Sequence, residues 1–146
     1  EPLELAFDVA CPVEHAFTVW TAKFGVWWPA GHSVSGRPEL VVLQGRVGGR
    51  IFERTATGVE HAWGRVTAWE PPHRLAYIWH LNQDPATPTD VEIRFVARGS
   101  DAARVEIRHT GWERLGDGGP SRRDRNRVGW STLLPHYRAA LEGEPR

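Results

Sequence analysis

The stretch that decides the fold is residues 47–81, VGGRIFERTATGVEHAWGRVTAWEPPHRLAYIWHL. Glycine and proline divide it into three segments of strand composition: Gly48 and Gly49 open the first, Gly58 marks the turn to the second, and a Pro-Pro pair precedes the third. This spacing predicts three consecutive antiparallel strands. The segment also carries tryptophans at positions 63, 69 and 79. Because burial of one large apolar side chain stabilises a protein by about 1.5–3 kcal/mol, another element must cover this aromatic face.

The residues before this stretch predict a strand, two short helices and a further strand. Residues 3–10 alternate between apolar and polar side chains, as a half-buried strand does. Residues 13–20 have helical spacing after Pro12, and residues 22–28 form a second short helix that ends at Pro29. Residues 30–38 have the composition of a loop, and residues 39–43 that of a short strand.

The residues after it predict two more strands and one long helix. Apolar side chains alternate around Ile93 and again around Ile107, where His109 takes a position that an apolar residue would normally hold. Residues 121–142 place Trp130, Leu134, Tyr137 and Leu141 on one helical stripe, which we expect to cover the sheet. Pro135 lies within this helix and removes one backbone hydrogen bond, so a bend near Ser131 is expected.

Composition limits the classes of function. A chain of 146 residues is long enough for one domain, residues 1–146, with a substantial core. Eighteen basic and eighteen acidic residues give no net charge, so the sequence argues against a nucleic acid partner. No apolar run is long enough to span a membrane, and the acidic start does not resemble a signal peptide. The single cysteine, Cys11, fits a reducing compartment, and we predict a cytoplasmic protein.

The predicted order of strand, two helices, six strands and long helix, with the motifs VGGRIFER, GRVTAWEPPHRL, HTGWERL and VGWSTLLPHY, resembles the START-like (SRPBCC) superfamily. Within it the chain resembles the bacterial branch of the family named after the C-terminal domain of the activator of the ninety-kilodalton heat-shock protein ATPase. The resemblance implies an α+β helix-grip fold: a curved antiparallel sheet of six to seven strands around a long C-terminal helix, with an apolar cavity between them. Members bind hydrophobic molecules, and a few cyclise or hydrolyse them. The separate domain by which the eukaryotic activator docks on its chaperone has no match in this sequence.

The side chains expected at this cavity are aromatic and a few polar ones. Apolar pockets orient a ligand with a small number of converging polar groups. For each aromatic ring and for His109 the alternative role is packing of the core, and for Arg127 the alternative is a solvent-exposed position at the start of the helix. The predicted ligand-binding residues are Trp27, Trp28, Trp63, Trp79, His109, Trp130, Tyr137 and Arg127.

Three residues are candidates for catalysis. Glu53 shares a strand face with Ile51, and if that face is inward, a buried carboxylate near His61 or Arg94 could act as a general base. A salt bridge is the alternative for Glu53. His109 could transfer a proton or simply be a hydrogen-bonded core residue. The sequence contains no metal-binding spacing of histidines and no serine-nucleophile motif, so we predict no metal and no cofactor.

The sequence therefore favours a non-catalytic protein that binds a small, mainly hydrophobic molecule under its last helix. A cyclase or hydrolase on the same fold is one alternative. A module that contacts a chaperone or another protein, connected with the stress response, is the other. Either a monomer or a homodimer is compatible with the sequence.

Overall fold

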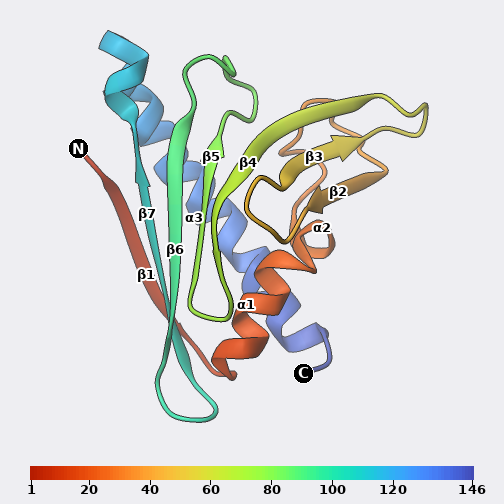
Figure 1. The fold of residues 1–146 in the computed structure, drawn as a ribbon, viewed down its shortest axis with the longest axis vertical. Helices are drawn as coiled ribbons and strands as arrows, with labels where there is room; N and C mark the ends of the chain where they lie inside the picture. The colour runs from red at the N-terminus through yellow and green to blue at the C-terminus, as the bar shows by residue number, and fades with distance from the viewer.

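The computed structural model describes residues 1–146 and contains one seven-stranded antiparallel sheet with helices on one side (Figure 1). The strands lie in the order β1-β7-β6-β5-β4-β3-β2, so β1 and β2 form the two edges. The predicted α+β class and helix-grip arrangement are confirmed. The elements in chain order are β1 (Leu3–Val9), α1 (Val13–Thr21), α2 (Phe24–Trp27), β2 (Leu40–Leu43), β3 (Arg50–Arg54), β4 (Glu60–Glu70), β5 (Arg74–Trp79), β6 (Thr89–Ala97), β7 (Ala103–Thr110), the 3₁₀ helix η1 (Trp112–Gly118) and α3 (Gly119–Gly143).

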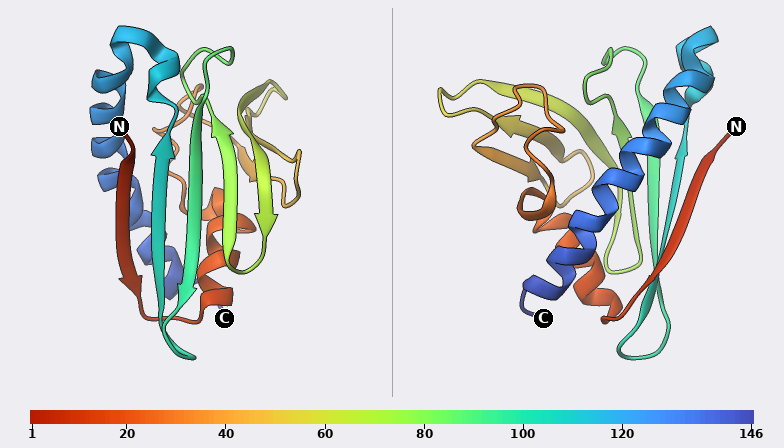
Figure 2. Two further views of the ribbon diagram at one scale, coloured as in Figure 1. Left: turned by 60° about the vertical axis from the view of Figure 1, so that its left-hand side comes forward. Right: turned by 180° about the vertical axis from the view of Figure 1, so that it is seen from behind.

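Helix α3 covers the inner face of the sheet and crosses it diagonally (Figure 2, right). Its buried side chains are Trp130, Leu133, Tyr137 and Leu141, whereas Leu134, which was predicted on this stripe, is only half-buried. Two hydrogen bonds join its C-terminal half to α1: the Tyr137 hydroxyl donates to the carbonyl of Ala16 at 2.7 Å, and a ring nitrogen of His15 bonds to the carbonyl of Leu141 at 2.8 Å. The end of α3 near the C-terminus is therefore fixed, whereas its beginning lies beside the loops at the opposite end of the sheet.

Two β-bulges change the side-chain alternation that the sequence predicts for β4. Irregular registers occur opposite Ile51 and again after Val66. As a result Trp63 and Val66 are both buried, while Arg65 and Thr67 lie outside. Strict alternation along β4 would place Arg65 and Thr67 on the same face as Trp63, and this expectation is wrong because each bulge adds a residue without a partner and shifts the strand by one position.

The chain also differs from prediction at the ends of two helices. The second short helix is a single turn, Phe24–Trp27, because the residues before it form a turn and Pro29 prevents its extension. The segment before the long helix is the 3₁₀ helix η1, and α3 begins at Gly119, two residues before the predicted start at residue 121. Helix α3 continues through Pro135 to Gly143.

The core between the sheet and the helices consists largely of interlocking aromatic rings. Trp20 is completely buried and contacts Trp27, Tyr137 and Trp130 at ring-centroid distances of 5.1, 4.9 and 6.0 Å. Most of these contacts have the edge-to-face geometry that aromatic pairs prefer. These rings fill the region beneath the middle of α3.

Candidate functional site

A pocket of about 240 Å³ lies beside the first half of α3, where the loops after α2 and after β5 meet. Helix α3 supplies one wall, the two loops supply the rim, and the end of β5 supplies the floor. The lining residues are Trp28, Gly31, His32, Trp79, Leu81, Asn82, Gln83, Arg122, Arg125, Asn126, Gly129, Trp130 and Leu133.

Three indole rings and two leucines, Leu81 and Leu133, form the apolar part of this pocket. Trp28 and Trp79 lie 5.5 Å apart between ring centroids, and Trp130 and Leu133 face the pocket from α3. The Trp28 indole N–H donates to the carbonyl of His32 at 2.6 Å, so this ring is fixed to its own loop. The Trp28 and Trp79 rings are inclined by 60° to each other, so together with Trp130 they form an apolar concave lining against which the rings of a ligand could pack.

His109 lies behind Trp130 and fixes its orientation. The indole N–H of Trp130 donates to Nδ1 of His109 at 3.2 Å, which assigns the ring proton to Nε2. Nε2 then donates to the hydroxyl of Thr89 at 2.7 Å, and this hydroxyl donates to the carbonyl of Trp79 at 3.3 Å. Burial lowers the pKa of His109 to about 3, so the imidazole is neutral and both nitrogens are used within the protein. The chain of bonds connects the Trp130 ring to the main-chain carbonyl of Trp79 on the other side of the pocket.

The polar part of the pocket carries positive charge without a carboxylate. Arg122 and Arg125 come from the first turns of α3, and neither forms an ion pair with an acidic side chain, whereas the neighbouring Arg123 pairs with Asp124. The side-chain oxygen of Gln83 is buried in the same region without a hydrogen-bond donor. A ligand with an anionic or strongly accepting oxygen would therefore find two unpaired guanidinium groups here.

Glu53 holds the loop that forms one rim of the pocket. Its carboxylate is completely buried and accepts four hydrogen bonds, from the N–H of Val34 (2.6 Å), the N–H and hydroxyl of Ser35 (3.1 and 2.6 Å) and the indole of Trp63 (2.8 Å). Burial alone would raise the pKa of Glu53, but these donors outweigh it and the pKa lies below its ordinary value. Glu53 is thus an anion with two donors on each oxygen, which is a poor arrangement for a general base.

The other predicted site residues lie away from the pocket. Trp27 and Tyr137 are buried in the core, where the indole of Trp27 donates to the carbonyl of Val19 at 3.0 Å. Trp63 is buried against Glu53, and His61 lies opposite Glu53 in the strand register without being among its four partners. Arg127 is exposed and does not line the pocket. The structure therefore brings together Trp28, Trp79 and Trp130 from the predicted set.

Sequence reasoning missed the polar residues that share the pocket with these rings. Arg122, Asn126, Gly129 and Leu133 recur at i, i+4, i+7 and i+11, which is the spacing of one helix face. That signal places Arg122 on the pocket side of α3. The loop residues His32, Asn82 and Gln83 gave no comparable signal, because their positions depend on two loops that meet only in the fold.

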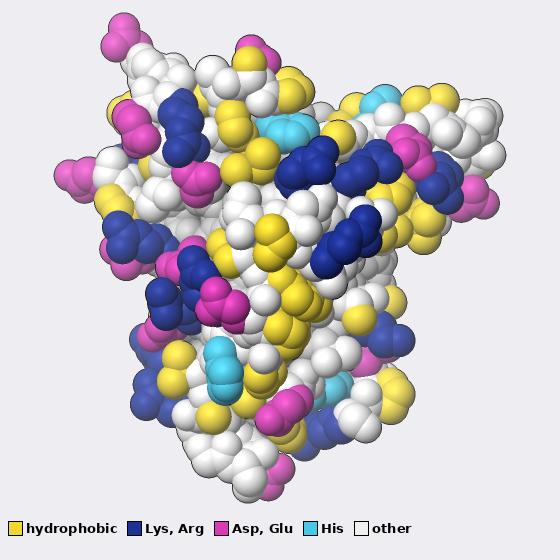
Figure 3. All heavy atoms as spheres, viewed as in Figure 1, with side chains coloured by type: hydrophobic (Ala, Val, Ile, Leu, Met, Phe, Trp, Pro, Cys, Tyr) yellow, Lys and Arg dark blue, Asp and Glu magenta, His cyan; other side chains and the backbone are white.

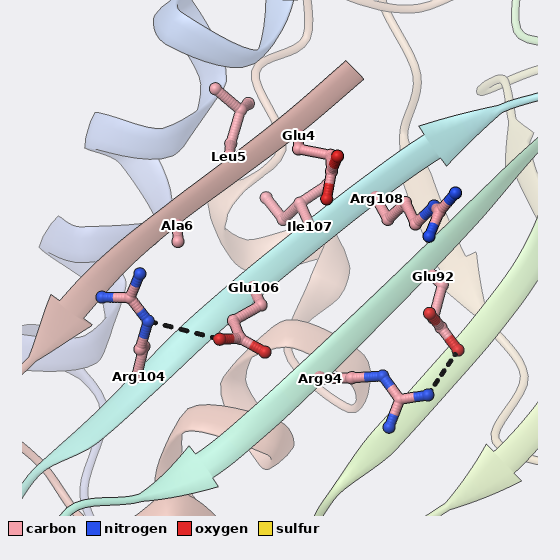
Figure 4. Close-up of a pocket in the computed structure, with 9 residues that line it drawn as sticks. All are labelled: Glu4, Leu5, Ala6, Glu92, Arg94, Arg104, Glu106, Ile107 and Arg108. Carbon is pink, nitrogen blue, oxygen red and sulfur yellow. Dashed lines mark hydrogen bonds and ion pairs between the residues drawn. The ribbon is translucent and has the colours of Figure 1, made fainter. Parts of the chain in front are cut away.

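A second hollow, of about 460 Å³, lies on the outer face of the sheet (Figure 4). It is lined by side chains of both signs, including the ion pairs Arg104–Glu106 and Arg94–Glu92, each at 3.3 Å. Figure 3 shows the same mixture of positive and negative side chains across this face. Because these charges neutralise one another in contact with solvent, the outer hollow offers a ligand little net field.

The structure contains neither a cluster of metal-binding side chains nor a helix able to cross a membrane. No group of three or more histidine, cysteine, aspartate or glutamate side chains is arranged to hold a metal ion. None of the helices combines the length and apolar character that crossing a bilayer requires.

A seven-stranded antiparallel sheet that grips a C-terminal helix, with an aromatic pocket between them, defines a START-like protein of the SRPBCC superfamily. The chain belongs to the family of activator of Hsp90 ATPase homolog 1-like proteins, whose sequence model matches residues 10–142.

Solved structures of several proteins are similar to this chain. The anthrahydroquino-γ-pyrone synthase Txn09 is 35% identical over 82% of both chains, with a TM-score of 0.59. The self-sacrificing resistance protein CalC from Micromonospora echinospora is 28% identical over 97% of this chain and 94% of its own, with a TM-score of 0.77. An HSP90 activator from Plasmodium falciparum is 19% identical over 99% and 97% of the two chains, with a TM-score of 0.67, which shows a common fold. No curated protein sequence gave a significant match.

Proposed function

We propose that the protein binds a small, flat, mainly hydrophobic molecule that carries an acidic oxygen. The observation that carries this proposal is the pocket in which the rings of Trp28, Trp79 and Trp130 face the unpaired arginines Arg122 and Arg125. The rings would cover the faces of the ligand, and the guanidinium groups would bind its anionic group at the rim. The likeness to Txn09, a synthase of an anthrahydroquino-γ-pyrone, supports a polycyclic aromatic ligand.

The charge requirement can be tested with two probes that differ in one group. 8-Anilinonaphthalene-1-sulfonate and N-phenyl-1-naphthylamine share their aromatic framework, and only the first carries a sulfonate. Calorimetric titration of the wild-type protein should show that the sulfonate binds at least about tenfold more tightly, the ratio that one charge-assisted hydrogen bond provides.

Arg125→Gln should reduce this preference, and Arg127→Gln is its matched control. Arg127 lies on the same helix two residues away and is exposed like Arg125, but it does not line the pocket. The control should therefore keep the wild-type preference. If both variants lose the preference for the sulfonate equally, the sulfonate responds only to the overall positive charge of the helix. If neither probe binds, the proposal is contradicted.

A reaction on the bound molecule is the second candidate, favoured by the synthase among the similar structures. Of the predicted catalytic residues, Glu53 and His109 are fully hydrogen-bonded within the protein, so each would have to exchange a bond to act on a substrate. His32 lines the pocket itself and is the first residue to substitute if turnover is found. Unchanged turnover in His32→Gln and Glu53→Gln would exclude catalysis by either side chain.

A chaperone partner is supported here only at the level of the family. The large apolar side chains that the surface exposes most, Val26, Val47 and Val128, come from three separate parts of the chain. Small-molecule binding therefore explains more of the structure than a docking role does.

A further inference from the structure

Two polar groups are buried in the aromatic core, on the far side of the rings that line the pocket. Trp20, from α1, is completely buried, and its indole N–H has no hydrogen-bond partner. Tyr77 points from β5, the central strand of the sheet, into the same region and is 1% exposed. Burial raises the pKa of Tyr77 far above its usual value, and the only polar group that counteracts this is the Trp20 N–H. The two side chains are therefore each other's polar neighbours.

Counting donors and acceptors shows that this pair is incomplete. An indole N–H can only donate, while a phenol offers one donor and an acceptor oxygen. Even if the Trp20 N–H turned fully onto the Tyr77 oxygen, the Tyr77 hydroxyl proton would still lack an acceptor. Buried polar groups are satisfied in the large majority of cases, and unsatisfied ones call for an explanation. This pair lacks an acceptor atom.

The pair is separated from the pocket by the rings that form the pocket floor. Tyr77 lies 5.6 Å from Trp79, and Trp20 lies 6.0 Å from Trp130, measured between ring centroids. Trp130 is fixed by its hydrogen bond to His109, and Trp28 by its bond to His32. The Trp79 side chain is held by ring contacts alone, with Trp28, Trp63 and Tyr77. Of the three pocket indoles, Trp79 is thus the one that can turn without breaking a hydrogen bond.

The size of the pocket also favours an inward extension. Pockets for organic ligands usually measure about 300–1,000 Å³, and this one measures about 240 Å³. A ligand of three fused rings that reached the arginines at the rim would press against Trp79 at the floor.

We infer that Tyr77 and Trp20 form an inner subsite for a ketone oxygen of the ligand, which becomes accessible when the Trp79 ring turns aside. This inference rests on the proposed function and makes the ligand more specific: a polycyclic aromatic ketone with its acidic group at Arg122 and Arg125 and a carbonyl oxygen at the inner pair. The carbonyl oxygen accepts from the Tyr77 hydroxyl and from the Trp20 indole. It supplies the acceptor that the pair lacks and adds no donor.

Anthraquinone-2-sulfonate and anthracene-2-sulfonate provide the test, because they share three flat rings and one sulfonate and differ in the two ketone oxygens. The wild-type protein should bind the quinone about tenfold more tightly than the hydrocarbon, as expected for one satisfied buried hydrogen bond. Tyr77→Phe should reduce this ratio to within about twofold of unity. Since this variant removes a hydroxyl without a protein acceptor, its urea midpoint should not fall below that of the wild type.

Tyr137→Phe is the matched control, because it removes the same atom from a buried tyrosine whose hydroxyl is bonded to the Ala16 carbonyl at 2.7 Å. It should lower the urea midpoint and keep the wild-type preference for the quinone. A direct readout is the indole N–H resonance of Trp20 in an NMR spectrum, assigned with Trp20→Phe. It should move on addition of the quinone and stay in place on addition of the hydrocarbon.

Three outcomes would overturn the inference, and they are distinguishable. If both sulfonates bind the wild type equally, the inner pair serves an internal water only, and the proposed pocket stands. If the quinone is preferred and Tyr77→Phe keeps that preference, the ketone is recognised elsewhere. If neither compound binds, the proposed function fails together with the inference.

Discussion

Replacing Glu53 by glutamine tests how strongly one buried carboxylate holds the pocket rim. Glutamine keeps one acceptor oxygen for the N–H of Val34 and the indole of Trp63, but its amide group points donors at Ser35. The Ser35 hydroxyl can turn to accept, whereas the Ser35 N–H cannot. Each of the two remaining bonds loses its charge, at about 1 kcal/mol each, and an N–H left without an acceptor costs about 1–3 kcal/mol. Because this N–H is only partly buried, we expect a total destabilisation of about 2–4 kcal/mol.

The assay is urea unfolding followed by tryptophan fluorescence, with Glu60→Gln as control. Glu60 is an exposed carboxylate that pairs with Arg50 and Arg54, so its loss should matter far less. The difference between wild type and Glu53→Gln should also depend on pH. Since the pKa of Glu53 is lower in the folded protein, its stabilisation is complete above the ordinary carboxyl pKa of 4.5 and is lost as the pH falls through the folded-state value. A destabilisation below about 1 kcal/mol, or one that does not shrink in acid, would refute this explanation of the rim.

Further predictions concern a buried histidine and two glycines. The pKa of His109 is about 3 in the folded protein, whereas its ordinary value is 6.5, so between these values the unfolded chain binds a proton that the folded protein does not. The free energy of unfolding should therefore fall as the pH decreases from about 6.5 to 3. His109→Gln should flatten this part of a stability curve measured by urea unfolding, and an unchanged slope would contradict the assignment. Gly64→Ala should destabilise the sheet by about 1–3 kcal/mol, because the added methyl group would overlap the carbonyl of Ile78 on β5. Gly129→Ala adds the same methyl group to open space on α3 and should raise the urea midpoint by the equivalent of about 0.5–1 kcal/mol, so a loss of stability there would contradict the helix geometry.

The fold could be predicted from sequence because its strongest signals are local. Strand alternation, the Gly and Pro punctuation of residues 47–81 and the apolar stripe around Trp130 each depend on neighbouring residues, and the structure contains the predicted elements. The errors arose where the backbone departs from a regular period. The bulges in β4 place Arg65 and Thr67 on the outer face, and the side-chain alternation of that strand does not predict the bulges.

The site was harder to predict because it depends on which aromatic rings pack in the core and which line the pocket. The sequence shows many aromatic residues of equal character, and only the packing separates Trp27 and Trp63, which are enclosed, from Trp28 and Trp79, which reach the pocket. The strand position of Glu53 left its direction open, and the structure shows that it points inward. Its partners could not be predicted either, because Val34 and Ser35 lie in a loop almost twenty residues away.

The most direct test of the proposed pocket is to locate a bound probe. Backbone NMR spectra of the ¹⁵N-labelled protein should be recorded during titration with 8-anilinonaphthalene-1-sulfonate. We predict that the shifted resonances cluster in residues 28–32, 79–83 and 122–133, which surround the pocket, and that those of Glu4 and Glu106 on the outer face stay in place. Shifts concentrated on the outer face, with the first half of α3 unaffected, would contradict the account.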